Sequence, residues 1–535
     1  MAEKGLAGAF VCVKVVGVKK QSETQEQCSV VERDGQQVFT LNSEYFIPED
    51  ASVRLTNAQL EELDYRELYA AYSSRGRKSV TDPRVLFKVL VYGYQCGIYS
   101  TRKLEEACRY RIDFKWLLWD EPVPDHSTIS RFRTGRCAEA VEDLFYQYVR
   151  YLETQGETDH ETVFIDGTKL ESSAGRYTFV WRKSVEKQLA KVKEKVREAT
   201  SATTLEALEK QLADEAAGIV FVYGPGHRKS AEQKTWEALD ELRRKWQEYE
   251  GKLAIMGNGR NSYSKTDPDA TFMRMKDDHM RNGQLKPGYN VQIGVNSEYI
   301  TGIDVFSNRT DYGTMVPFLK TMQRKHGKKY KSATTDAGYE RLSNYLYLEA
   351  NGQMSFIKPA NYEQQKSSGF KKQIGRMENM TYDAEEDSYT CTQGRKLSLR
   401  RECAELQNGR FITTAWYRCE SCTGCPVREK CCQAKDTEQA KELRVNKTLK
   451  ELRKTSLENI TTEYGIYLRL CRSIQVEGAF GLIKNDFGFR RFLTRGKKNI
   501  RTELFFLALA FDLKKLWMKR DKGRLRTHLS EISAA

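Results

Sequence analysis

The stretch TVFIDGTKLESSAG, residues 162–175, begins with an apolar run that reaches a carboxylate at its fifth position. The three residues before Asp166 are β-branched or aromatic, which predicts a short buried strand. Asp166 and Gly167 are expected to end that strand. Asp-Gly is a common turn dipeptide, but a carboxylate at the mouth of a buried strand is costly to desolvate unless something pairs with it. Two interpretations therefore stay open, a turn and a metal ligand.

The composition indicates a large protein with a polyanionic partner. A chain of 535 residues is expected to form one large domain with insertions and one or two smaller domains. It holds 88 Lys and Arg against 73 Asp and Glu, and residues 484–527 alone hold fourteen basic and four acidic residues. Phenylalanines and the apolar run LFFLALAF (504–511) interrupt these charges, so the segment is expected to fold. Nucleic acid is the favoured partner.

No targeting or membrane-spanning segment is expected. The apolar run GAFVCVKVV (8–16) is short and contains Lys14, and no run reaches about 18 apolar residues. A soluble cytoplasmic protein follows. In that setting, thirteen cysteines favour thiols or metal ligands over a disulfide framework.

The segment between residues 57 and 151 has a helical pattern. Within it, residues 126–136 follow a Pro-containing turn, and Arg131, Arg133 and Arg136 are spread along a short helix. A helix-turn-helix with this segment contacting DNA fits the pattern. A helical bundle with a basic face fits it equally well.

A second helical pattern and a set of strands follow. Two apolar seams at helical spacing in residues 181–255, separated by Gly-Pro-Gly at 224–226, predict an antiparallel helical hairpin. A β-hairpin (289–308), a helix, a strand ending at Asp336, a second helix and a last strand (354–360) come next. With the first strand, this order predicts an α/β fold with a mixed five-stranded sheet covered by helices.

Three carboxylates are expected to meet in that sheet. The first and fourth strands are neighbours in the predicted order, so Asp166 and Asp336 emerge side by side, and a bound cation relieves their repulsion. The third lies in RSIQVEGAFGLIKNDFGFRRF (472–492), where Glu477, Phe480, Gly481 and Lys484 share one helical face. We expect this face to pack closely against the sheet.

Three motifs carry a resemblance to a known family. DGTK at Asp166, TDAGY at Asp336 and VEGAFGLIK at Glu477 resemble the acidic triad of the bacterial DDE insertion-sequence transposases, which have an RNase H-like core. The resemblance covers roughly residues 55–520. Three further stretches resemble the subgroup with a helical insertion and a cysteine cluster: RYTFVWRKS (176–184), DPDATFMRMK (267–276) and KPGYNVQI (286–293).

The helix of Glu477 departs from the pattern seen in many members of this family. That pattern reads Tyr, two residues, Arg, three residues, Glu, six residues, Lys. Here Glu477 and Lys484 keep the last interval, whereas Leu470 and Ser473 stand at the Tyr and Arg places. Tyr467 and Arg472 are the nearest substitutes.

The resemblance implies a DNA transposase that binds terminal inverted repeats, cleaves the element ends by two-metal hydrolysis and joins the 3′-hydroxyl ends to target DNA. Asp166, Asp336 and Glu477 are expected to hold two Mg²⁺ or Mn²⁺ ions. A homodimer without a membrane or nucleotide cofactor is implied, associated with the bacterial nucleoid when bound to DNA. The residues expected to contact DNA are Lys484, Arg472, Arg490, Arg491, Arg495, Lys497, Lys498, Arg131, Arg133 and Arg136.

Two alternatives to this function stay open. One is a metal-dependent DNA endonuclease on an RNase H-like fold that cuts without strand transfer. The other is a catalytically silent DNA-binding regulator derived from a transposase.

A cysteine cluster predicts a second metal site. YRCESCTGCPVREKCC (417–432) contains two overlapping C-x-x-C pairs, and thiolates at this spacing select Zn²⁺ in a tetrahedral structural site. An iron–sulfur cluster is the alternative. The expected zinc ligands are Cys419, Cys422, Cys425 and Cys431, with Cys432 as the alternate and Cys391 and Cys403 as possible replacements.

These expectations divide the chain into seven segments. They are an N-terminal extension without an assigned role (1–45), a helical DNA-binding domain (46–155), the first core strand (156–180), a helical-hairpin insertion (181–260), the continued core (261–360), a Cys-rich zinc insertion (361–455), and the Glu helix with basic C-terminal helices (456–535).

Overall fold

The computed structural model describes residues 43–72, 79–224, 226–275, 283–407, 409–432 and 439–528. The N-terminal extension expected at 1–45 lies outside the described residues, except for its last three.

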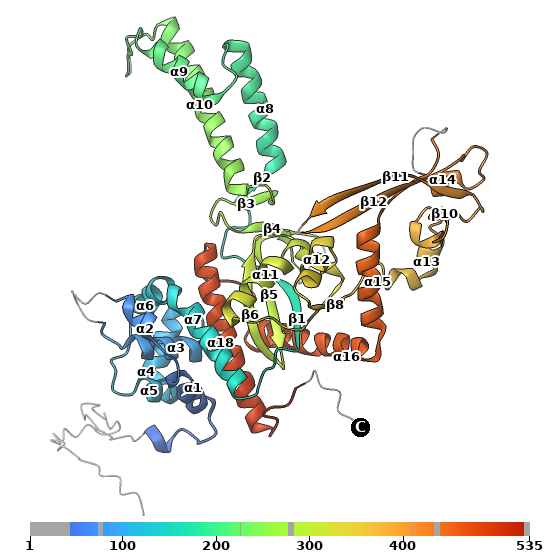
Figure 1. The fold of residues 1–535 in the computed structure, drawn as a ribbon. Helices are drawn as coiled ribbons and strands as arrows, with labels where there is room; N and C mark the ends of the chain where they lie inside the picture. Colours follow the sequence, from blue (N-terminus) through green and yellow to red (C-terminus); the bar gives the residue numbers. More distant parts are fainter. Residues whose placement is uncertain are drawn as a thin grey trace, which may run out of the picture.

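A six-stranded mixed sheet forms the centre of the molecule (Figure 1). Its strand β1 pairs antiparallel with β5 and parallel with β7, and β7 pairs parallel with β8. Strands β4 and β6 both pair antiparallel with β5, along different parts of its length. The predicted mixed α/β architecture is confirmed, and β4 is an additional strand. The bounds are β1 (Thr162–Glu171), β4 (Thr271–Arg274), β5 (Leu285–Asn296), β6 (Tyr299–Phe306), β7 (Ser332–Thr335) and β8 (Met354–Ile357).

Helices cover both faces of this sheet, because alternate side chains of a strand point to opposite faces. Phe164 of β1 belongs to the apolar cluster that includes α18 (Lys497–Asp521). Its neighbours Val163 and Ile165 belong to a second cluster. That cluster contains residues from three further helices, α11 (Met315–His326), α12 (Leu342–Ala350) and α15 (Lys447–Thr461).

The sequence predicted that strand β1 ends at Asp166, and this prediction is wrong. It continues to Glu171, and Gly167 pairs with Gln292 inside the ladder with β5. Asp-Gly is therefore not a turn here. The glycine meets a steric requirement instead: a Cβ at Gly167 would lie 2.2 Å from the Gln292 side-chain nitrogen and 2.4 Å from Oδ1 of Asp311.

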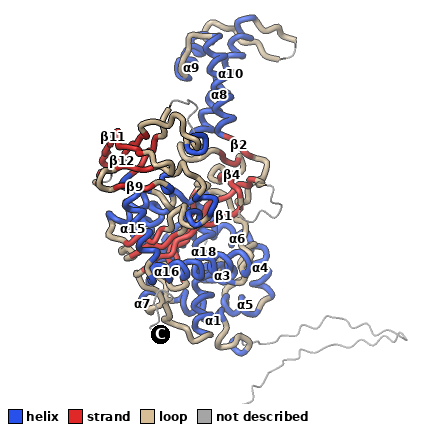
Figure 2. Tube along the Cα trace, turned by 90° about the vertical axis from the view of Figure 1, so that its right-hand side faces the viewer, coloured by secondary structure: helices blue, strands red, loops and turns tan. Residues whose placement is uncertain are grey.

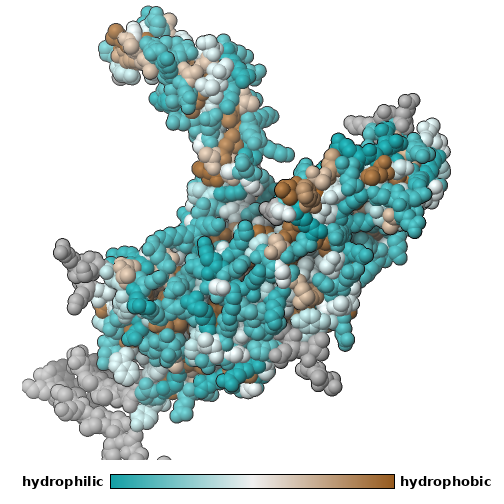
Figure 3. All heavy atoms as spheres, in the orientation of Figure 1, coloured by the Kyte–Doolittle hydropathy of each residue, from teal (hydrophilic) through white to brown (hydrophobic). Residues whose placement is uncertain are grey.

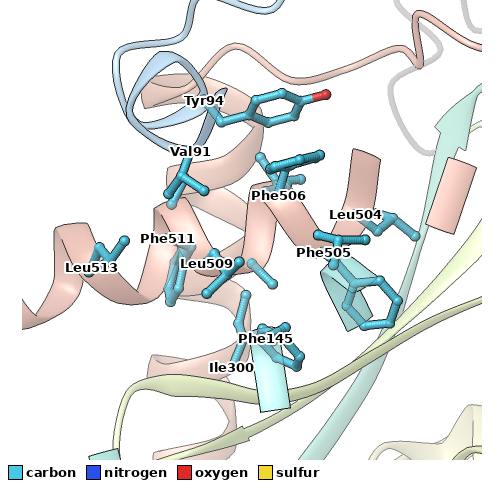
Figure 4. Close-up of a cluster of buried hydrophobic side chains, with 14 of the residues drawn as sticks. Val91, Tyr94, Phe145, Ile300, Leu504, Phe505, Phe506, Leu509, Phe511 and Leu513 are labelled. Atoms are coloured by element: carbon cyan, nitrogen blue, oxygen red, sulfur yellow. The ribbon is translucent and has the colours of Figure 1, made fainter. Parts of the chain in front are cut away.

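The N-terminal helices share one apolar cluster with β5, β6 and α18. Helix α18 contains the run LFFLALAF, and all eight of these residues are buried. Figure 4 shows Val91, Tyr94, Phe145 and Ile300, from three other elements, around Phe505, Phe506 and Leu509 of α18. The basic C-terminal segment is therefore folded. The N-terminal helices are α1 (Ser52–Glu61), α2 (Arg66–Ala70), α3 (Pro83–Gln95), α4 (Thr101–Tyr110), α5 (Ile112–Leu118), α6 (His126–Arg131) and α7 (Cys137–Thr154).

An arm of three helices projects from the sheet (Figures 1 and 2). The predicted hairpin corresponds to α8 (Arg182–Ala199) and α10 (Ala231–Met256), and the sequence analysis missed α9 (Leu205–Ala216) between them. The short strands β2 (Phe179–Trp181) and β3 (Ser262–Ser264) pair at its base. Apolar side chains of all three helices form one cluster, and hydrophilic residues cover most of the arm surface visible in Figure 3.

The Cys-rich insertion contains a five-stranded sheet of order β13-β12-β11-β10-β9. It follows β8 in the chain and ends where α15 begins. The bounds are α13 (Ser368–Lys371), β9 (Thr381–Asp383), β10 (Ser388–Thr390), β11 (Lys396–Gln407), β12 (Arg410–Cys419), α14 (Arg428–Cys431) and β13 (Glu442–Asn446). Short 3-10 turns outside the site are η1 (Ser43–Tyr45), η5 (Gln364–Lys366) and η6 (Met377–Asn379).

Candidate active site

Asp166 and Asp336 lie at the same edge of the sheet. Residues 162–164 of β1 pair in parallel with 332–334 of β7, and the same register continued by two residues places the two Asp side by side. Oδ1 of Asp166 accepts a hydrogen bond from the Gly167 amide at 2.7 Å. Asp336 caps the 3-10 turn η4 (Ala337–Tyr339) and accepts from the Gly338 amide at 2.9 Å. Backbone N–H groups therefore orient both carboxylates.

Glu477 lies on a long helix that contains two π-helical turns. The successive segments are α16 (Glu463–Arg472), η7 (Ser473–Glu477), α17 (Gly478–Gly481) and η8 (Leu482–Asp486), of which η7 and η8 are π-helical. Such turns add a residue to the helix and are frequent at functional sites. Glu477 and Lys484 each lie within one of them.

The expected packing face of this helix is correct for Phe480, which is partly buried against the main apolar cluster, but not for Glu477 and Gly481. The side chain of Glu477 is 62% exposed, and a Cβ added at Gly481 would meet nothing within 4 Å. Between residues 472 and 486, the buried residues are Gln475, Val476, Ala479 and Ile483. Val476, Ala479 and Ile483 keep the spacing of an α-helical face but each lies one position before the expected residue. Glu477 therefore lies at the border of the packed face.

Arg472 connects Glu477 to Asp166. Its Nη1 donates to Oδ2 of Asp166 at 3.2 Å, and its Nη2 lies 3.8 Å from Oε1 of Glu477. In a π-helical turn, residues five apart lie above one another, as Arg472 and Glu477 do here. The family pattern places an Arg four positions before the Glu, where this chain has Ser473. The wider π-helical turn lets Arg472, five positions before Glu477, reach the same carboxylate.

A buried polar network that the sequence analysis did not find lies beneath the two Asp. The amides of Asn290 and Gln292 each donate to Oδ1 of Asp311 at 2.8 Å, and the Tyr339 hydroxyl donates to Gln292. Burial raises the pKa of Tyr339 well above its ordinary value, and the carboxylates of Asp311, Asp166 and Asp336 act in the same direction. All three carboxylates therefore lie near this hydroxyl. Asp311 begins the 3-10 turn η3 (Asp311–Gly313) after β6.

One signal for this network was present in the sequence. Asn290 and Gln292 interrupt the apolar residues of β5. Both side chains are buried, at 1% and 0% exposure. A buried amide requires a buried partner, and here that partner is Asp311.

The described residues contain no group of three or more His, Cys, Asp or Glu side chains arranged to hold a metal ion. At the carboxylate edge, which we define as Asp166, Asp336 and Glu477, the two Asp meet through strand register. Glu477 is linked to them through the Arg472 guanidinium.

The basic segment after this helix lies against the end of β1. Arg491 donates to the carbonyls of Ser172 and Ala174, and Arg495 donates to Ser173. Arg490 folds back onto Lys484 and Asn485. Lys498 forms an ion pair with Glu139 of α7, and the Lys497 ammonium lies 5.8 Å from the centre of the Phe306 ring. The segment thus borders the strand that carries Asp166.

The expected DNA-contacting helix of the N-terminal region consists of α6 and the π-helical turn η2 (Phe132–Arg136). Arg131 and Arg136 are exposed, and the Arg136 guanidinium stacks over the Tyr72 ring at 4.2 Å. Arg133 is 5% exposed and donates to the carbonyl of Tyr99. The prediction that Arg133 contacts DNA is therefore wrong, because its guanidinium is committed to the interior.

The cysteine cluster surrounds a small cavity of about 20 Å³. Burial and a contact with Cys422 raise the pKa of the Cys419 thiol to about 11. Cys403, which we considered as a replacement ligand, is exposed on β11 and does not line the cavity. The cysteines that line it are Cys391, Cys419, Cys422, Cys425, Cys431 and Cys432.

The chain matches two protein families. Residues 390–517 match the family described as "Transposase DDE domain", and residues 41–135 match "Transposase domain (DUF772)". The first match contains Glu477, whereas Asp166 and Asp336 lie outside both. No curated protein matches the chain. Together, these two matches support an insertion-sequence DDE transposase.

The matched transposase domains imply an enzyme whose substrate is DNA. None of the described helices is both long and apolar enough to span a lipid bilayer.

Proposed function

We propose that this transposase binds the terminal inverted repeats of an insertion sequence, cleaves the element ends by two-metal hydrolysis, and joins the 3′-hydroxyl ends to target DNA. The observation that carries the proposal is the carboxylate edge. Two strands in parallel register bring Asp166 and Asp336 together, and Arg472 contacts both Asp166 and Glu477.

We propose an RNase H-like core for this chain. The strand order β6-β5-β1-β7-β8, with β1, β7 and β8 parallel and β5 and β6 antiparallel to their neighbours, supports this assignment. Asp166 then lies on the central strand, and Asp336 directly follows its parallel neighbour.

The residues of the carboxylate edge suit hard divalent cations. They offer only carboxylate oxygens, which Mg²⁺ and Mn²⁺ prefer. Asp166, Asp336 and Glu477 would hold a pair of such ions, which when bound would activate the attacking oxygen and stabilise the leaving one. Asp166 would serve both ions, and Asp336 and Glu477 would serve one each. Because Glu477 is exposed, it can turn toward the Asp pair without unpacking the helix.

Basic residues of the chain position the carboxylates and hold the DNA. Arg472 positions Asp166 and Glu477 through its two terminal nitrogens. Lys484 is half-buried two turns further along the helix, where an ammonium suits a phosphate. Arg490, Arg491, Arg495, Lys497 and Lys498 follow the backbone of the element end beside β1. In the N-terminal helices, Arg131 and Arg136 remain the proposed DNA contacts.

We propose that the cysteine cavity holds a structural Zn²⁺ ion. The support is that six cysteines line one cavity in the Cys-rich insertion, and thiolate ligands select zinc. We also propose a homodimer, since transposition pairs two DNA ends.

A strand-transfer assay tests the proposed function. Purified protein is incubated with Mg²⁺, a labelled duplex containing the terminal repeat, and a target plasmid. Joined product is expected. Cut but unjoined product would indicate a nuclease, and binding alone would indicate a regulator.

A further inference from the structure

A fourth carboxylate, that of Asp311, lies against the carboxylate edge. It comes from the turn after β6, and its Oδ1 is fixed by the Asn290 and Gln292 amides at 2.8 Å. Oδ2 lies on the side of Asp336: both oxygens of Asp336 and Oδ2 of Asp311 are within 4 Å of the position that a Cβ at Gly338 would occupy.

A glycine makes this approach possible. Gly167 follows Asp166 directly within β1, and a side chain there would collide with Asp311 Oδ1 at 2.4 Å. At Gly338, two residues after Asp336, a Cβ would lie 3.8 Å from Asp311 Oδ2, an ordinary contact distance. The strand that carries Asp166 therefore omits a side chain where Asp311 comes close.

The two hydrogen bonds that Asp311 accepts do not explain why the residue at this position is negatively charged. An Asn at this position would accept the same two bonds without adding negative charge beside Asp166 and Asp336. Like charges this close repel one another unless a cation compensates them. None of the ion pairs formed by the described residues involves Asp311 or Asp336, whereas Asp166 pairs with Arg472. A cation bound at the Asp311 and Asp336 side would compensate these charges.

We infer that Asp311 contributes the negative charge of a fourth carboxylate to divalent-cation binding at the Asp166 and Asp336 edge. The inference rests on the proposed function, since it assigns a further residue to the same site. Gln292 and Asn290 hold the carboxylate in place. The hydrogen bonds to Asp311 thus fix its position, and its negative charge attracts the cation.

Mn²⁺ binding to the full-length protein tests this role without relying on DNA cleavage. Free Mn²⁺ is measured by electron paramagnetic resonance during titration of wild type, Asp311→Asn and a control, Asp304→Asn. Asp304 is a partly buried carboxylate on β6 that accepts from the Val305 amide. We expect Asp311→Asn to weaken Mn²⁺ binding at least about tenfold, and Asp304→Asn to bind like wild type.

Asp166→Asn separates the two proposals. If it weakens Mn²⁺ binding while Asp311→Asn binds as wild type does, the role of Asp311 is overturned and the proposed function stands. If wild type binds no Mn²⁺, the proposed metal site fails, and the role of Asp311 fails with it.

A measurement on wild type covers the case in which Asp311→Asn does not fold. Fe²⁺ replaces Mn²⁺, and ascorbate with hydrogen peroxide generates hydroxyl radicals that cut the polypeptide near the bound ion. Cuts near residues 166, 336 and 311 are expected. Cuts near 166 and 336 without any near 311 would overturn the inference.

Discussion

The carboxylate edge and the cysteine cavity assemble side chains in opposite ways. Five of the six cysteines lie within residues 419–432, so local chain geometry brings them together. Asp166, Asp336 and Glu477 are separated by more than a hundred residues each, and strand register and a helix crossing bring them together. A site of the first kind belongs to one insertion, whereas a site of the second kind depends on the whole core.

Removal of a carboxylate gives the largest expected effect in this comparison. Asp166→Asn, Asp336→Asn and Glu477→Gln should each lower the rate of DNA cleavage by on the order of a thousandfold or more, because a lost metal ligand removes several kcal/mol of transition-state stabilisation. Gel assays of labelled element ends measure the rate, and binding to the same duplex should remain. Glu463→Gln, an exposed acid at the start of the same long helix, is the matched control. Retained cleavage in one variant removes that residue from the site.

Removal of two cysteines should disturb only the insertion. In Cys419→Ser/Cys422→Ser, bound zinc measured by elemental analysis should fall from about one to below roughly 0.1 per chain, because a tetrahedral site needs four ligands. Proteolysis should then become faster within residues 361–455. Cys403→Ser should keep its zinc, because this thiol does not line the cavity. Equal loss of zinc in both variants would contradict the assignment.

Substitution of Arg472 tests how much the contact between Asp166 and the Glu477 helix contributes to the cleavage rate. Arg472→Lys keeps the charge but cannot contact Asp166 and Glu477 with a planar fork. Cleavage should fall roughly tenfold to a hundredfold, as expected when a charged hydrogen bond worth about 1.5–3 kcal/mol is lost. Arg469→Lys, whose guanidinium lies over the Tyr362 ring, is the control. If the two variants cleave equally well, Arg472 has no special role.

The smallest effect is expected at Asp512, a buried carboxylate away from both sites. Burial raises its pKa well above the ordinary value, so the folded state keeps a proton that the unfolded state loses as the pH rises. This carboxyl therefore costs increasingly more stability as the pH rises above its ordinary pKa of 3.8. Asp512→Asn, which keeps an acceptor for the Ile300 amide, should raise Tm by about 1–4 °C at pH 8 and less at pH 5. An equal shift at both values would show that Asp512 is not protonated in the fold.

The sequence predicted those features that depend on local pattern or on element order. Cysteine spacing indicated the cluster, and the succession of strands and helices placed Asp166 beside Asp336 on neighbouring parallel strands. The apolar run 504–511 correctly indicated a folded C-terminal segment. Its burial between the N-terminal helices and β6 follows from its apolar residues on all sides.

Other features could not be predicted from spacing. The Glu477 helix contains two π-helical turns, and no residue type identifies such a turn in one sequence. Asp311 meets the site only because β5 and β6 fold back beside β1. Arg133 carries the same charge as Arg131 and Arg136, and only tertiary packing distinguishes the buried one.

Anomalous diffraction from a Mn²⁺-soaked crystal of the protein bound to its element end tests the central claim most directly. The account predicts two anomalous peaks about 3.5–4 Å apart, in contact with oxygens of Asp166, Asp336 and Glu477. Manganese bound elsewhere, or a Glu477 carboxylate that stays turned away from both peaks, would contradict it.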